Sequence, residues 1–155
     1  MNNVRRLNRI MATLFNNVLK VEESVMKKSR IHNLSVSEIH TLEAIGQGAA
    51  KTMTHVADAL KINISTLTAA INKLVTKGYV NRFRIPEDRR MVMVELSEIG
   101  SRAVREHEAF HLAMIRKALS QLSSEETEKF IESLQNVNEF MLMRLTKAKT
   151  KEPST

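Results

Sequence analysis

Two adjacent arginines, Arg89 and Arg90, are the residues whose chemistry is easiest to interpret. They follow Pro86-Glu87-Asp88, which has turn composition, and they lie between segments 79–85 and 91–96, which have strand composition. An arginine at the tip of a two-stranded ribbon can enter a narrow A·T-rich minor groove, and Asp88 is placed to orient one of the pair. The pattern favours DNA binding over the alternative, a solvated turn with an incidental pair of charges.

A predicted helix that ends before Gly78 carries a second group of polar residues. Either Asn63 or Ser65 can cap its start. One face has short hydrogen-bonding or methyl-bearing residues near the start and lysines further along, which suits base edges and phosphates, although a solvated face can have the same composition. The apolar residues fall on the opposite side, which we expect to be buried: Leu67, Ile71, Leu74 and Val75.

We therefore assign DNA binding to this helix and to the hairpin that follows it. In this assignment Thr68 or Asn72 lies near bases, and Lys73 contacts a phosphate. Arg90 enters the minor groove. The full predicted set is Ser65, Thr66, Thr68, Ala69, Asn72, Lys73, Lys77, Arg82, Arg84, Asp88, Arg89 and Arg90.

A helix-turn-helix must position these residues. The apolar residues of segment 52–60 share one helical face, Thr52 can cap that helix, and only two residues separate it from the next. Upstream, Ser35-Val36-Ser37-Glu38 is a capping box that starts a helix running to about Gly46. The two strands of the hairpin are short and need a neighbour to be stable, so we expect the hairpin to pack against the helices. These features predict a winged helix-turn-helix lobe over residues 35–98.

Long amphipathic helices are predicted at both ends of the chain. Segment 1–28 repeats apolar residues at steps of four and three, a coiled-coil-like seam, and a second helix runs from Ser97 to about Leu122. A third starts at the capping box Ser123-Ser124-Glu125-Glu126 and runs to about Leu145. Their apolar faces exceed what one small domain needs, so we expect an intertwined homodimer, with a monomeric bundle as the alternative. The predicted fold is mainly α, a winged helix-turn-helix with long N- and C-terminal dimerisation helices, divided into 1–34, 35–98, 99–147 and a tail, 148–155.

His107 and His111 are four residues apart on the second of these helices, a spacing that can bind zinc with help from Glu108, His40 or Glu43. Few further zinc ligands are available, since the chain has no Cys and no second close pair of His and carboxylate. We therefore assign no metal site. Zinc binding at His107 and His111 stays as the alternative to partly exposed helix histidines.

Composition narrows the class of protein. A formal charge of +7 favours a polyanionic partner, most often nucleic acid, then an anionic membrane surface or an acidic protein. No apolar run reaches the ~20 residues of a membrane span and no secretory core is present, so we expect a cytoplasmic protein. The absence of Cys excludes disulfides and a cysteine redox sensor. No Gly-rich phosphate loop, nucleophile elbow or apolar carboxylate pair supports an enzyme.

The DNA-binding region resembles a known family. Asp88-Arg89-Arg90, five further residues and Leu96-Ser97-Glu98-Ile99-Gly100, with Lys77-Gly78-Tyr79-Val80 and a helix-turn-helix before them, resemble the signature of the MarR family of winged-helix regulators. The family more often has Thr where this chain has Ser97, which keeps the capping hydroxyl. The resemblance implies an obligate homodimer that binds palindromic double-stranded DNA as a transcriptional regulator, with a ligand pocket between the dimer helices and the DNA-binding lobe.

The N-terminal half is similar to one subgroup of that family, the fatty-acid-synthesis repressors of Gram-positive bacteria. The similar residues are Phe15-Asn16-Asn17-Val18-Leu19, Glu22-Glu23, Ser29-Arg30, Glu38-Ile39-His40-Thr41 and Ile45-Gly46. The resemblance implies repression of fatty-acid synthesis genes with a corepressor, a long-chain acyl group on acyl carrier protein. The alternatives are a zinc- or other small-molecule-responsive regulator and an architectural nucleic-acid binder without an effector.

Nine Met and many branched aliphatic residues can line an adaptable alkyl tunnel, and a basic surface suits the acidic carrier, although such residues more often form ordinary core. We expect the acyl chain to contact Phe15, Met26, Leu42, Phe110 and Met114, and the carrier protein to bind at Lys27, Lys28 or Arg30.

Overall fold

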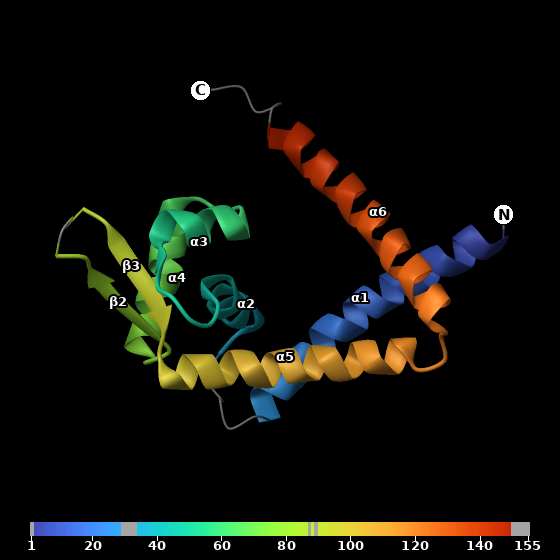
Figure 1. Cartoon of the computed structure of the whole chain (residues 1–155), viewed down its shortest axis with the longest axis horizontal. Helices are drawn as coiled ribbons and strands as arrows, with labels where there is room; N and C mark the ends of the chain where they lie inside the picture. Colours follow the sequence, from blue (N-terminus) through green and yellow to red (C-terminus); the bar gives the residue numbers. More distant parts are fainter. Residues whose placement is uncertain (1, 29–33, 87, 89, 150–155) are drawn as a thin grey trace. The chain divides into compact units, whose positions relative to one another are not determined.

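The structure, a computed structural model, describes residues 2–28, 34–86, 88 and 90–149, without the side chains of 26–28 and 146–149 (Figure 1). It confirms a mainly helical chain with a winged helix-turn-helix. Residues 1–109 form one compact unit and residues 110–155 another, and each is described by itself. The elements are α1 (Asn2–Lys28), α2 (Val36–Ile45), β1 (Lys51–Thr52), α3 (Met53–Leu60), α4 (Ile64–Thr76), β2 (Val80–Arg84), β3 (Val92–Leu96), α5 (Glu98–Leu119) and α6 (Ser124–Lys149).

Side-chain caps set the starts of the helices in the DNA-binding lobe. The predicted capping box at α2 is confirmed, because Ser35 Oγ accepts from the Glu38 N–H and the Glu38 carboxylate accepts from the Ser35 N–H. Thr52 caps α3 by accepting from the His55 N–H at 3.1 Å. At α4 the residue that caps is Asn63, whose Oδ1 accepts from the Thr66 N–H at 2.8 Å.

The turn between α3 and α4 is tight because Lys61 adopts a left-handed conformation with φ of 56°. Residues other than Gly and Asn rarely adopt a positive φ. The residue types at this turn therefore did not predict the left-handed conformation of Lys61. The predicted left-handed glycine at the end of α4 is confirmed at Gly78, with φ of 81°.

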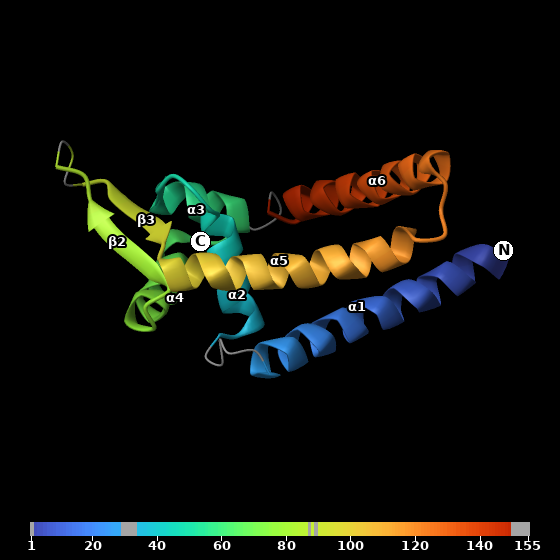
Figure 2. The same ribbon diagram turned by 60° about the horizontal axis from the view of Figure 1, so that its bottom comes forward.

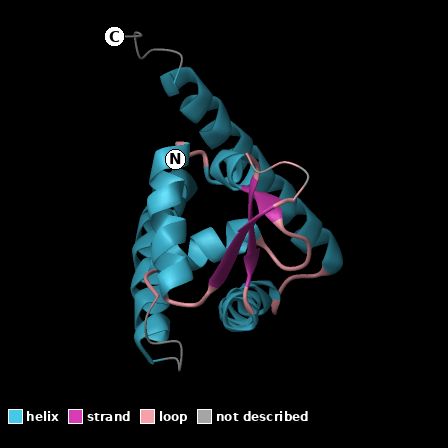
Figure 3. Cartoon of the chain, turned by 90° about the vertical axis from the view of Figure 1, so that its left-hand side faces the viewer, coloured by secondary structure: helices cyan, strands magenta, loops and turns pink. Residues whose placement is uncertain are grey.

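The hairpin forms part of a three-stranded antiparallel sheet in the order β1-β3-β2 (Figure 3). Its register pairs Val80 with Leu96, Arg82 with Val94 and Arg84 with Val92. The expected packing of the hairpin against helices is confirmed, because β2 contacts α4 and β3 contacts α2 and α3. In addition, β3 pairs with β1, a strand of only two residues. A strand this short has no readable alternation, and the sequence did not predict it.

The hydrophobic core lies among α2, α3, α4, the sheet and the start of α5 (Figure 2). Its fully buried side chains include Ile39, Leu42, Ile45, Val56, Leu67, Ile71, Leu74 and Val94. The predicted buried side of α4 is thus confirmed except at Val75, which is 39% exposed. This core fixes which face of α4 remains at the surface.

The predicted apolar stripe of α1 lies largely at the surface of the single chain, since Leu7 is 59% exposed and Leu14 is 47% exposed. In the second unit, α6 begins at the predicted capping box, where Ser123 Oγ accepts from the Glu126 N–H. It continues to Lys149, beyond the predicted end at Leu145, because Lys and Ala are good helix formers. Among the described helices, none is both long enough and apolar enough for a membrane span.

Candidate nucleic-acid interface

The outward face of α4 carries the polar residues that the sequence assigned to DNA. Leu67, Ile71 and Leu74 recur at steps of four and three and are fully buried, which holds the helix against the lobe in one rotation. The opposite side therefore faces solvent. Its predicted DNA-binding residues Ser65, Thr66, Ala69, Asn72 and Lys73 are exposed, and Thr68 is half-buried.

Local hydrogen bonds set the chemistry of the first turns of α4. Thr68 Oγ1 donates to the Ile64 carbonyl at 2.7 Å, and Ser65 Oγ donates to Asn63 Oδ1 at 2.8 Å. Because each hydroxyl already donates its proton to a group of α4 or of its N-cap, each oxygen presents only lone pairs to an approaching group. These residues suit base-edge donors such as the amino groups of adenine and cytosine.

The wing brings further cations to the same lobe. Arg82 and Arg84 are exposed on β2, and Arg90 is exposed just before β3. Asp88 Oδ1 accepts from the backbone N–H of Arg90 at 2.9 Å, so Asp88 orders the turn through the main chain. The predicted contact residue Arg89 lies outside the described residues.

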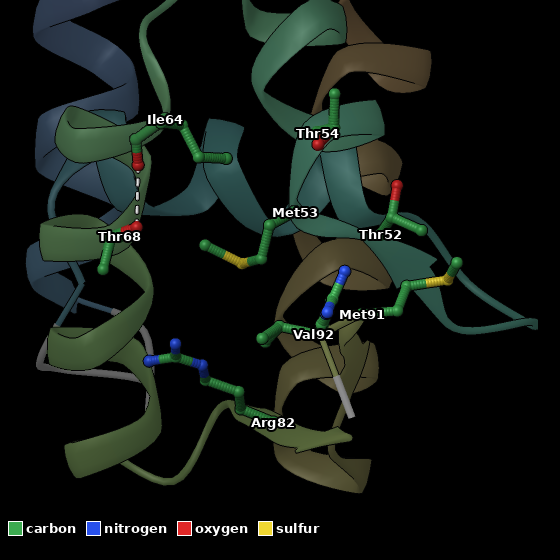
Figure 4. Close-up of a pocket in the computed structure, with 9 residues that line it drawn as sticks. Thr52, Met53, Thr54, Ile64, Thr68, Arg82, Met91 and Val92 are labelled. Atoms are coloured by element: carbon green, nitrogen blue, oxygen red, sulfur yellow. Dashed lines mark hydrogen bonds between the residues drawn. The ribbon is translucent and has the colours of Figure 1, made fainter. Parts of the chain in front are cut away.

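A hydrogen bond joins the wing to α4, since Arg82 Nη1 donates to Asn72 Oδ1 at 2.9 Å. Beside it lies a cavity of about 390 Å³, into which residues from α3, α4 and the hairpin project (Figure 4). Its lining combines two arginines with hydroxyl and apolar side chains: Thr52, Met53, Thr54, Ile64, Thr68, Arg82, Arg90, Met91 and Val92. The structure therefore brings part of the predicted DNA-binding set together around one concave surface.

Lys77 lies differently from the other predicted DNA contacts. Its Nζ is 2.8 Å from both carboxylate oxygens of Glu38, and its side chain is only 24% exposed. Burial raises the pKa of Glu38, but hydrogen bonds from Lys77 and Ser35 outweigh it and lower that pKa below its ordinary value. The ion pair occupies the Lys77 ammonium in the free chain, and a contact of Lys77 with DNA stays a prediction.

A buried cluster of ionisable groups lies away from this interface, around His107. The His107 side chain is 1% exposed, its Nδ1 is 2.6 Å from Glu43 Oε1, and its Nε2 is 3.8 Å from Glu22 Oε1. His40 contacts the imidazole edge-on, with ring centroids 5.7 Å apart. The expectation of a partly exposed histidine is wrong for His107, because the imidazole is enclosed between α1, α2 and α5.

Glu22 also belongs to this cluster and was not predicted from the sequence. A signal was present, because Glu22 lies four residues after Val18 and three before Val25, two apolar residues of α1 that are half-buried, so its carboxylate falls on the same side of the helix. Glu22 is 3% exposed. His111 follows His107 by one turn of α5 and is half-buried.

The predicted acyl-contact residues lie in different environments. Leu42 is fully buried in the core of the lobe, whereas Phe15 is 56% exposed on α1. In the second unit, Phe110 and Met114 are half-buried one turn apart on α5. The side chains of Met26, Lys27 and Lys28 and all of Arg30 lie outside the described residues, so the predicted tunnel and carrier site stay predictions.

A second cavity, of about 330 Å³, lies between α2, α3 and α4 and was not predicted. Thr66 and Ala70 of α4 contribute to its wall, so a molecule bound there would touch the helix that carries the DNA-facing residues. Its lining mixes apolar and polar side chains: Ser37, Glu38, His40, Thr41, Leu60, Ile62, Thr66 and Ala70.

Comparison with known proteins gives consistent matches. The model of the MarR family matches residues 34–92. The transcriptional regulator PecS of Dickeya dadantii is 30% identical over 120 residues, which cover 76% of this chain and 72% of PecS. The crystal structure of Streptococcus pneumoniae FabT in complex with DNA is similar, with 35% identity and a TM-score of 0.82 over 89% of this chain and 96% of FabT. The regulator BldR from Sulfolobus solfataricus has 25% identity and a TM-score of 0.62, over 89% of this chain and 96% of BldR.

Proposed function

Since the chain belongs to the MarR family of DNA-binding transcriptional regulators, we propose that it is a homodimeric repressor of fatty-acid synthesis genes whose corepressor is a long-chain acyl group on acyl carrier protein. The observation that carries this proposal is the similarity to FabT, which extends over 89% of the chain at a TM-score of 0.82. The similarity thus includes the terminal helices as well as the DNA-binding lobe.

Homodimerisation is supported by the apolar faces of α1 and α6. In the single chain, Leu7 and Leu14 of α1 are 59% and 47% exposed, and Leu134 and Met141 of α6 are 43% and 50% exposed. Soluble monomers rarely expose contiguous apolar surface on this scale, because its burial stabilises association. A dimer of two identical lobes would bind two identical half-sites, which requires a palindromic operator.

DNA contact in this proposal is divided between α4 and the wing. The exposed hydroxyl and amide groups of α4 meet base edges in the major groove, and Lys73 meets a phosphate. Arg90 at the wing enters the adjacent minor groove. The net charge of +7 strengthens binding to any duplex, so specificity must come from the base contacts.

The acyl effector is proposed from chemistry as well as similarity. An alkyl chain needs an apolar site that adapts its shape, and flexible Met side chains provide one. An acidic carrier protein is attracted to a basic surface, and the formal charge of the chain has the right sign. The expected contacts remain Phe15, Met26, Leu42, Phe110 and Met114, with Lys27, Lys28 or Arg30 receiving the carrier.

The test is fluorescence-anisotropy binding to the promoter of its own operon and to scrambled DNA. Each duplex is titrated with the protein alone, with long-chain acyl carrier protein and with the unacylated carrier. Tighter operator-specific binding only with the acylated carrier supports the proposal. Equal binding with and without acylation contradicts the corepressor, and equal binding to both duplexes contradicts operator recognition.

A variant separates the acyl site from the dimer. Phe15→Glu places a charge where the alkyl chain is expected, and burial of that charge is unfavourable. The acyl-dependent rise in operator affinity should disappear, while the dimer persists in analytical ultracentrifugation. An unchanged rise would remove Phe15 from the proposed site.

A second candidate, zinc responsiveness, is favoured by one observation, the environment of His107. Its Nδ1 is 2.6 Å from Glu43 Oε1, the arrangement in which a carboxylate orients a zinc-binding imidazole. The other ring nitrogen is 3.8 Å from Glu22, and His111 is one turn further along α5. Imidazole and carboxylate groups are ordinary zinc ligands.

Calorimetric titration of the full chain with Zn²⁺ tests this candidate. His107→Gln should abolish zinc binding, whereas His55→Gln, at an exposed histidine of α3, should leave it unchanged. A rise in operator affinity with zinc alone, lost in His107→Gln, would favour zinc over the acyl group. No saturable binding would exclude it.

A further inference from the structure

Arg82 of β2 and Asn72 of α4 are exposed residues on different elements, and a hydrogen bond joins them. This bond links the wing to α4 and also constrains the side chain of Asn72. We propose that Arg82 is a positioning residue that sets the base preference of α4 by fixing the side-chain amide of Asn72. This inference rests on the proposed role of α4 as the helix that reads base edges. It concerns which base is selected and not how tightly the backbone of DNA is held.

The geometry of the pair is defined by both elements. Arg82 is held in register by its pairing with Val94 on β3, and Figure 4 shows its side chain reaching toward the helix that carries Ile64 and Thr68. Asn72 follows Thr68 by one turn, so both lie on the same side of α4. The distance from Arg82 Nη1 to Asn72 Oδ1 is 2.9 Å.

The direction of this bond fixes the amide. A guanidinium group has five N–H donors and no acceptor, so the atom of Asn72 that faces Arg82 must be the oxygen. The amide N–H₂ group is then turned away from the arginine. Without Arg82, the amide of an exposed asparagine can rotate by half a turn and exchange the positions of donor and acceptor.

The fixed amide selects among bases by its donors. In the major groove, guanine presents two acceptors and thymine presents O4, whereas bidentate contact with adenine requires an asparagine oxygen that accepts from the adenine amino group. Arg82 already donates to that oxygen and places a positive group beside it. The pair therefore favours guanine or thymine over adenine at the base that Asn72 meets.

The chain contains a matched control for the loss of charge. Arg84 lies two residues along β2 from Arg82, so it projects from the same face of the strand, and it is also exposed. Within the described part of the chain, Arg84 makes no hydrogen bond to α4. Arg84→Ala removes the same charge as Arg82→Ala without touching the Asn72 amide.

The experiment selects binding sites from a randomised double-stranded DNA library with the full-length protein and with Asn72→Ala, Arg82→Ala, the double variant and Arg84→Ala. Selected sites are then measured by anisotropy with each of the four bases at each position. Thermal unfolding is expected to be the same for all variants, because both partners are exposed at the surface.

We expect Arg82→Ala and Asn72→Ala to lose discrimination at the same base pair, by on the order of tenfold. The double variant should lose no more than either single one, because the two residues act through one contact. Arg84→Ala should weaken binding to all sites alike and leave the preference unchanged.

The inference is overturned if Arg82→Ala leaves the base preference unchanged, as Arg84→Ala does, while Asn72→Ala alters it. It is also overturned if the losses of base discrimination in Arg82→Ala and Asn72→Ala add in the double variant. Ser65→Ala and Thr66→Ala distinguish failure of the Arg82 inference from failure of the proposed role of α4 in reading bases. If these variants alter base preference and Asn72→Ala does not, α4 still reads DNA and only the Arg82 inference falls. If no variant of α4 alters any preference, the proposed role of α4 falls with it.

Discussion

The ammonium of Lys77 lies 2.8 Å from both carboxylate oxygens of Glu38, so the residue that ends α4 is tied to the first turn of α2. Glu38 also closes the capping box of α2 through the Ser35 N–H. One carboxylate therefore holds the start of one helix and the end of another. The ion pair thus adds a polar link to the apolar packing that holds α4 against the lobe.

Glu38→Gln is expected to lower the free energy of unfolding at neutral pH by about 1 kcal/mol, since it removes a charge-assisted bond from a partly buried lysine. The folded-state pKa of Glu38 is lowered below its ordinary value of 4.5. The ion pair therefore contributes fully above pH 4.5, and its contribution is lost as the pH falls through the folded-state pKa. Denaturation at a series of pH values should show the variant and the parent protein converging in acid.

Glu98→Gln is the matched control for Glu38→Gln. Glu98 is 3.7 Å from Arg102 and its side chain is 90% exposed, so its loss should change the free energy of unfolding by less than about 0.5 kcal/mol. A difference between Glu38→Gln and the parent that persists unchanged below the folded-state pKa would show that the ion pair is not its cause.

Gly100 marks a close approach between α5 and the chain that leads into β2. A Cβ at this position would lie 2.1 Å from the Tyr79 carbonyl oxygen, and backbone atoms cannot yield cheaply. Gly100→Ala should therefore destabilise the fold by about 3 kcal/mol, measured by chemical denaturation at fixed protein concentration. Ser101→Ala, one residue further on, should change stability by less than about 0.5 kcal/mol, and equal losses at both positions would contradict the steric explanation.

Much of the helical framework could be predicted from single residues because caps act locally. Ser35 with Glu38, Thr52 and Ser123 with Glu126 each satisfy backbone groups within the same turn, so type and spacing in the sequence determine the structure. The choice between Asn63 and Ser65 required the structure, since both side chains can cap. There, Ser65 donates to Asn63 and does not replace it.

Contacts distant in sequence could not be predicted in the same way. Glu38 and Lys77 lie on separate helices, as do Glu22 and His107, and neither pair has a characteristic spacing. The same limit applied to β1, whose two residues become a strand only by pairing with β3. Lys77 was assigned to DNA from its charge and its position on the helix. Its ion pair with Glu38 could not be predicted from the sequence.

Ser97 joins two elements through one hydroxyl. Its Oγ accepts from the Gly100 N–H at 3.1 Å at the start of α5 and donates to the Gly78 carbonyl at 2.7 Å after α4. Ser97→Ala should lower the free energy of unfolding by about 1–2 kcal/mol because both bonds are lost. Ser97→Thr keeps the hydroxyl and should retain most of the stability in the same denaturation assay, whereas equal losses for Ala and Thr would show that the hydroxyl is not responsible.

Arg90 is expected to contribute to DNA affinity and not to the fold. It is exposed at the wing, and its backbone N–H is held by Asp88 Oδ1 at 2.9 Å, which orders the turn without fixing the guanidinium group. Arg90→Ala should weaken operator binding by about tenfold, because one groove contact is lost. The dimer and the thermal unfolding temperature should be unchanged, as followed by ultracentrifugation and circular dichroism.

Asp88→Ala tests the ordering of the wing turn separately from the charge of Arg90. It leaves Arg90 in place but removes the acceptor for its N–H, so the arginine must be ordered when DNA binds and the affinity should fall less than in Arg90→Ala. The double variant should then bind no more weakly than Arg90→Ala, because the role of Asp88 passes through Arg90. If Arg90→Ala binds the operator as tightly as the parent protein, the wing does not contact DNA and the affinity must come from α4 and the remaining cations.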